Sequence, residues 1–105
     1  MKFTAKEIGA LNLAIYMMNY IDGDLYKEKI FPDDFCTKYK KHYPLTYQSL
    51  IREVLIRINE EEEIDFKHIC VGIPTNYSNQ DVKYYLKLFH NALINCNEIS
   101  SHSNR

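Results

Sequence analysis

The strongest constraint on the fold is an uninterrupted helical repeat of apolar residues between Thr46 and Ile58. Apolar side chains recur there at positions i, i+3, i+4, i+7, i+8 and i+11, the spacing of one face of an α-helix. These positions are Tyr47, Leu50, Ile51, Val54, Leu55 and Ile58. Because the opposite positions are mostly polar or charged, we expect an amphipathic helix over residues 46–61 that buries one side.

Two further segments begin with residues that cap helices. Thr4 and Glu7 have the spacing of a capping box, and Ser78 and Asp81 have the same spacing. Helical repeats of apolar residues follow both pairs, which predicts helices over residues 4–21 and 78–96. The first of these helices is apolar on two neighbouring faces. Its second face consists of Ala10, Leu13, Met17 and Tyr20. A helix that is apolar around much of its circumference is expected in the middle of a bundle.

The connecting segments predict two or three short helices. Pro32 suits the first position of a short helix that ends before Pro44. Residues 25–31 read either as a short helix or as an irregular crossing, and residues 64–73 read either as a short helix or as a strand. We favour a helix within 64–73, because a lone strand would have no partner elsewhere in the chain.

Together these elements predict an all-α fold: a single small irregular helical bundle with three main helices plus two or three short ones. A chain of 105 residues supports one domain. We therefore expect residues 1–97 to form a single helical domain and residues 98–105 to form a flexible polar C-terminal tail.

Charge and cysteine usage narrow the possible partners and compartments. Thirteen lysines and arginines against fourteen acidic residues leave a formal charge of -1, so the whole chain has no electrostatic drive toward nucleic acid or anionic membranes. No apolar run approaches the roughly 20 residues that cross a bilayer. Cys36, Cys70 and Cys96 are odd in number and widely spaced, which favours three free, buried thiols and a cytoplasmic location.

The sequence offers no recognisable catalytic or metal-binding motif. His68 and Cys70, even with Cys36 or His90, lack the two closely spaced ligand pairs of a structural zinc site. Three glycines are too few for the phosphate-binding loops of nucleotide enzymes. We therefore expect no enzymatic activity, no cofactor and no metal.

An acidic stretch carries the main functional hypothesis. Five acids fall within six positions, namely Glu60, Glu61, Glu62, Glu63 and Asp65. We call this the acidic segment, with Asp22, Asp24 and Tyr77 as expected rim contacts. Acids beside tyrosines can steer and bind a partner with a basic surface. The prediction is an immunity or inhibitor protein that neutralises a toxin, plausibly a nuclease, by stoichiometric binding.

Two alternatives stay open at this point. Residues 33–42 and 46–58 resemble the two helices of a helix-turn-helix unit, which predicts a small nucleic-acid-binding regulator. Its contacts would be Lys38, Lys40, Lys41, Gln48, Arg52 and Arg57. The turn between the helices contains Pro44 and no glycine, and the acidic segment follows at once, so we rank nucleic acid below a protein partner. A homo-oligomeric structural domain is the other alternative.

Overall fold

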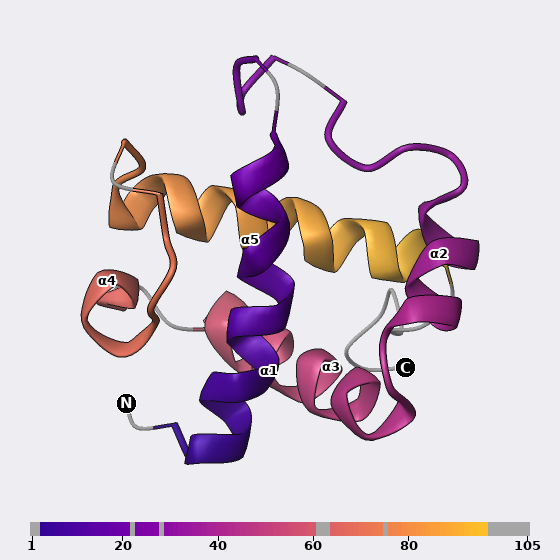
Figure 1. The fold of residues 1–105 in the computed structure, drawn as a ribbon, viewed down its shortest axis with the longest axis horizontal. Helices are drawn as coiled ribbons and strands as arrows, with labels where there is room; N and C mark the ends of the chain where they lie inside the picture. The colour runs from indigo at the N-terminus through magenta and orange to yellow at the C-terminus, as the bar shows by residue number, and fades with distance from the viewer. Residues whose placement is uncertain (1–2, 22, 28, 61–63, 75, 97–105) are drawn as a thin grey trace.

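The protein is built from helices that cross one another at steep angles (Figure 1). The computed structural model describes residues 3–21, 23–27, 29–60, 64–74 and 76–96. Within these ranges the helices are α1 (Ala5–Tyr16), η1 (Met17–Tyr20), α2 (Phe35–His42), α3 (Leu45–Glu60), α4 (Phe66–Ile69) and α5 (Asn79–Asn95). The described ranges contain no strand, so the predicted all-α class is confirmed.

The capping residues predicted for the first and last helices are confirmed. The Thr4 hydroxyl accepts a hydrogen bond from the Glu7 amide at 3.1 Å, and the Thr4 amide donates to Glu7 Oε1 at 2.8 Å. Ser78 and Asp81 form the same reciprocal pair at the start of α5, at 3.1 and 2.9 Å. Each capping box satisfies two amides that the helix itself leaves unpaired.

The start of α2 differs from the prediction. Pro32 does not occupy the first helical position, because the helix begins at Phe35. The Pro32 carbonyl instead accepts a hydrogen bond from the Phe35 amide at 2.9 Å, which closes a turn before the helix. Asp34 has φ -90° and ψ 12°, outside regular helical geometry. The proline therefore lies in the turn before the helix, and the helix begins about one turn later than expected.

The core lies where α1, α3 and α5 meet. In Figure 1, the upper half of α1 runs across α5 and its lower half runs across α3, while α3 lies below α5 and α2 stands at the C-terminal end of α5. The predicted inner face of α3 is largely confirmed, since Ile51, Val54, Leu55 and Ile58 are buried. Tyr85 of α5 is also fully buried, and its hydroxyl donates to the carbonyl of Ala14 in α1 at 2.6 Å. This bond satisfies a polar group that would otherwise be costly to bury.

A disulfide corrects the expectation of three free cysteines. Cys36 of α2 and Cys96 at the end of α5 are bonded, with their Cα atoms 5.6 Å apart. An odd cysteine count rules out complete pairing but leaves one pair possible, and packing of α2 against α5 brings these two together. Cys70 remains free and buried, and burial raises the pKa of its thiol to about 11.

The ambiguous segments take irregular or short helical forms. Residues 25–27 form a turn, and residues 66–69 form the helix α4, which is the reading favoured over a strand. Gly72 follows with φ +83°, a conformation that favours glycine.

The predicted tail, residues 98–105, lies outside the described residues. None of the helices in the described ranges has the length and hydrophobicity needed to cross a membrane.

Candidate functional site

The described part of the acidic segment is exposed. Glu60 ends α3 and Asp65 precedes α4, and both are exposed. Neither forms an ion pair with a described residue. Glu61, Glu62 and Glu63 lie outside the described residues. Two of the five carboxylates are therefore open to solvent and carry no salt bridge inside the described fold.

Asp65 is held in place by the first turn of α5. Its Oδ1 accepts a hydrogen bond from Asn79 Nδ2 at 3.1 Å, and Asn79 Oδ1 in turn accepts from the Lys67 amide at 3.0 Å. Asn79 is the first residue of α5. The carboxylate is thus oriented by a neutral amide, which leaves its negative charge uncompensated by this contact.

The rim residues have different surroundings. Asp24 is exposed, and its Oδ1 accepts from the Tyr26 amide at 2.9 Å within a tight turn. Tyr77 is half-buried and packs against the core, so only part of it can meet a partner. Asp22 lies outside the described residues.

The turn that carries Asp24 is also fastened to the first turn of α5. The Tyr26 hydroxyl donates to Asp81 Oδ1, and the Tyr26 ring stacks on Tyr84 with centroids 4.4 Å apart. Asp81 and Asn79 belong to the same helical turn. The structure therefore anchors two separate acidic parts of the chain, around Asp24 and around Asp65, to one end of α5.

The Tyr26–Asp81 contact shifts the ionisation of both groups. Hydrogen bonding to the carboxylate raises the pKa of Tyr26 to about 12, because ionisation would remove the donor and place two negative charges together. The pKa of Asp81 is lowered, first by the Ser78 amide and then by the Tyr26 hydroxyl. Asp81 is therefore a capping and anchoring group.

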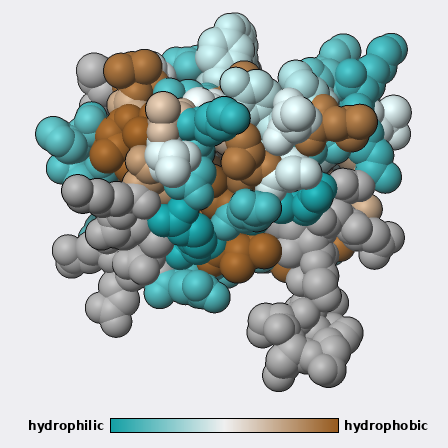
Figure 2. All heavy atoms as spheres, turned by 90° about the horizontal axis from the view of Figure 1, so that it is seen from below, coloured by the Kyte–Doolittle hydropathy of each residue, from teal (hydrophilic) through white to brown (hydrophobic). Residues whose placement is uncertain are grey.

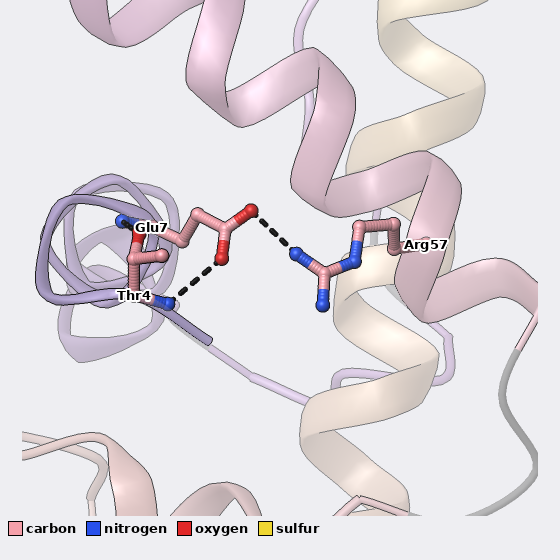
Figure 3. Close-up of polar contacts among 3 residues, drawn as sticks. All are labelled: Thr4, Glu7 and Arg57. Carbon is pink, nitrogen blue, oxygen red and sulfur yellow. Dashed lines mark hydrogen bonds and ion pairs between the residues drawn. The ribbon is translucent and has the colours of Figure 1, made fainter. Parts of the chain in front are cut away.

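Two of the six side chains predicted to contact nucleic acid, Gln48 and Arg57, make contacts inside the fold instead. Gln48 is buried and donates to the carbonyls of Tyr43 at 2.7 Å and Lys40 at 3.4 Å. Arg57 pairs with Glu7, which also receives the Thr4 amide, and so links α3 to the start of α1 (Figure 3). A side chain buried in the helix junction cannot read a base edge, so Gln48 was wrongly placed among the contacts.

Two more of the side chains predicted to contact nucleic acid, Lys38 and Arg52, also contact neighbouring residues. Lys38 forms an exposed ion pair with Asp34 at 3.2 Å, and Arg52 contacts the Ser49 hydroxyl at 3.3 Å.

In the described part of the chain, no group of three or more His, Cys, Asp or Glu side chains is arranged to hold a metal ion. The cysteines at 36 and 96 are bonded to each other and offer no thiolate.

An apolar groove between α1 and α2 was not predicted. It has a volume of about 450 Å³. The α1 side and the 3₁₀ turn after it contribute Leu13, Tyr16 and Met17, and α2 contributes Phe35, Lys38, Tyr39 and His42. Pro32, Tyr43 and Pro44 complete the lining. One wall of the groove is therefore formed by α2 and the residues on either side of it. The other wall is formed by α1 and η1.

Leu13 and Met17, two of the four residues of the second apolar face predicted for the first helix, line this groove. Leu13 of α1 is 37% exposed and Tyr20 of η1 is 68% exposed, so the predicted helix is not enclosed on all sides as the middle of a bundle would be. Apolar side chains are also exposed elsewhere: Figure 2 shows them in several separate groups among hydrophilic residues. The groove differs from those groups because it is a concave volume with walls from two helices.

Comparisons with protein-family models, with curated proteins and with solved structures find nothing that matches this chain.

Proposed function

We propose that the chain is a small protein-binding module of the immunity or inhibitor type. It would neutralise a toxin-like protein, plausibly a nuclease, by binding it stoichiometrically through the acidic segment and the neighbouring Asp24 turn. The partner would present a basic surface, such as a cleft that accommodates phosphates. No catalytic step by this chain is required, because occupying the cleft excludes the substrate.

One observation carries the proposal. The first turn of α5 holds Asp65 through Asn79 and holds the Asp24 turn through Tyr26 and Asp81. Carboxylates from distant parts of the chain are thereby presented on fixed supports beside one helix end. Preorganised charge of this kind raises the rate of encounter with an oppositely charged protein, and it limits the conformational entropy lost on binding.

The cytoplasm is the compartment that the sequence predicts for this function. The Cys36–Cys96 disulfide weakens the basis of that prediction, because disulfides persist mainly in oxidising compartments. Thiol alkylation during denaturing lysis of native cells, which also exposes the buried Cys70, distinguishes the cases. Alkylation of all three cysteines without prior reduction would agree with the cytoplasm, and protection of Cys36 and Cys96 would favour an oxidising compartment.

Affinity capture from the native cell, with matched baits, tests the function. The wild-type chain, a Glu60→Lys/Asp65→Lys variant and a Glu53→Lys/Asp33→Lys variant would be compared at equal loading. Both variants change the charge equally, but Glu53 and Asp33 are exposed positions outside the proposed surface. We expect a basic partner in a 1:1 ratio on the wild-type and control baits, with strongly reduced recovery on the Glu60/Asp65 variant.

The captured protein must also lose its toxic or nuclease activity when the wild-type chain is added. Equal recovery on both charge-reversed baits would contradict the proposed surface. A captured protein that keeps its activity in the 1:1 complex would contradict the inhibitor assignment.

A further inference from the structure

The groove between α1 and α2 combines an apolar lining with a basic edge. Its described lining includes Lys38 and His42 and no carboxylate. These two residues are four positions apart on α2, so their side chains lie on the same side of the helix. Leu13, Met17 and Phe35 supply apolar surface between the helices. This charge distribution suits an occupant with an apolar body and one anionic end.

The size of the groove indicates a small molecule. Pockets for small ligands have volumes of about 300–1,000 Å³ and are lined mainly by apolar and aromatic side chains with a few polar groups. At about 450 Å³, with Tyr16, Phe35, Tyr39 and Tyr43 in its lining, the groove belongs to this class. We infer that it binds a small apolar carboxylate, either aliphatic or aromatic, with the carboxylate at the Lys38–His42 edge.

The ion pair of Lys38 is compatible with this role. Lys38 and Asp34 are 3.2 Å apart, and their side chains are 63% and 58% exposed. An exposed pair of this kind contributes little to stability, so a ligand carboxylate can displace Asp34 at small cost. This site is separate from the acidic segment and does not depend on the protein-binding proposal.

Titration with decanoate, followed by NMR of ¹³C-labelled methionine methyl groups, tests the inference. Met17 lines the groove, whereas the adjacent Met18 is buried in the core. We expect a saturable shift of the Met17 methyl signal and a much smaller shift for Met18. Decyltrimethylammonium, which has the same chain length and the opposite charge, should bind roughly tenfold more weakly, a difference of about 1.4 kcal/mol. Naphthoate tests an aromatic body in the same way.

Two charge reversals on α2 separate the groove from the overall charge of the chain. Lys38→Glu should weaken decanoate binding by about tenfold. Lys41→Glu changes the net charge equally at an exposed position that does not line the groove, and it should leave binding unchanged. Leu13→Gln should weaken binding, whereas Leu45→Gln, at an exposed position outside the groove, should not.

Several results would overturn the inference. Equal affinity for the anionic and cationic probes would remove the charge assignment, and equal loss in the Lys38 and Lys41 variants would do the same. The absence of a saturable Met17 shift would exclude the site. Self-association of the free chain that Leu13→Gln abolishes would mean that a second copy, and not a carboxylate, fills the groove.

Discussion

The Tyr26 hydroxyl donates a hydrogen bond to the Asp81 carboxylate across 55 residues of sequence. Tyr26 lies in the turn formed by residues 25–27, outside the helices, and Asp81 lies in the first turn of α5. The bond therefore fixes the Asp24 turn relative to the helix end that also holds Asp65.

This contact predicts unusually weak acidity for the Tyr26 hydroxyl. In an NMR titration of ring-labelled tyrosines, the Tyr26 signal should titrate with a pKa of about 12. Asp81→Asn removes the negative charge but keeps an oxygen acceptor, and it should move the pKa of Tyr26 back toward 10. An unchanged Tyr26 pKa in this variant would show that Asp81 is not the cause. Spectra of Lys87→Gln, an exposed change on the same helix, provide the control.

The Cys36–Cys96 disulfide predicts one free thiol and a large effect of reduction. Thiol titration of the unfolded, unreduced protein should find Cys70 alone, whereas three thiols would contradict the disulfide. The bond closes a loop with a sequence separation of 60 residues. On the chain-entropy model, breaking it should lower the free energy of unfolding by roughly 4 kcal/mol. Guanidinium unfolding with and without reductant measures this, and a Cys36→Ala/Cys96→Ala variant should be insensitive to reductant.

Helical periodicity and capping patterns correctly predicted the three long helices because these signals are local. Thr4 with Glu7, and Ser78 with Asp81, bond within a single turn, so their spacing in the sequence is sufficient. The disulfide could not be predicted in the same way. It depends on how α2 meets the end of α5, which is a property of the packed chain.

In the candidate site, too, local features could be predicted from the sequence, whereas contacts between distant segments could not. The exposure of Glu60 and Asp65 agrees with the solvated acids expected from the sequence. The link from Asp65 to Asn79, and the groove beside Leu13, arise only when distant segments pack. Leu13 and Met17 of the second apolar face were a signal for the groove, but the whole face was predicted to lie inside the bundle. Gln48 was misread because a polar residue on an amphipathic helix is usually solvated.

Burial of His90 predicts a loss of stability at mildly acidic pH. Desolvation lowers the pKa of His90 below its ordinary value, and its Nδ1 is buried without a hydrogen-bond partner. The unfolded chain therefore binds this proton more readily than the folded chain. The stabilising contribution is complete above about pH 6.5 and is lost as the pH falls toward the folded-state pKa.

Unfolding free energies at pH 7.5 and 5.0 check this prediction. The difference between the two values should shrink in His90→Asn, because the titrating group is removed. His68→Asn, at an exposed position, should retain the wild-type difference. A wild-type stability that is constant between these pH values would contradict the role of His90.

The link between Glu7 and Arg57 predicts a measurable coupling between α1 and α3. The pKa of Glu7 is lowered, first by the Thr4 amide and then by Arg57, and the Arg57 guanidinium also lies 4.8 Å from the centre of the Phe3 ring. Arg57→Met should lower the free energy of unfolding by about 1–2 kcal/mol.

A double-mutant cycle of Glu7→Gln and Arg57→Met separates the ion pair from the capping contact of Glu7. We expect a coupling energy of about 0.5–1.5 kcal/mol, because the pair is only partly exposed. Lys87→Met, an exposed substitution on α5, should be nearly neutral. A coupling energy near zero would show that the two side chains act independently.

The most direct test of the protein-binding proposal is the association rate with the captured partner, measured by stopped flow over a range of salt concentrations. We expect Glu61→Lys/Glu62→Lys to slow association by about tenfold at low salt and to flatten its salt dependence. Glu53→Lys/Asp33→Lys should behave like the wild-type chain. An association rate and salt dependence unchanged by the Glu61 and Glu62 reversals would contradict binding through the acidic segment.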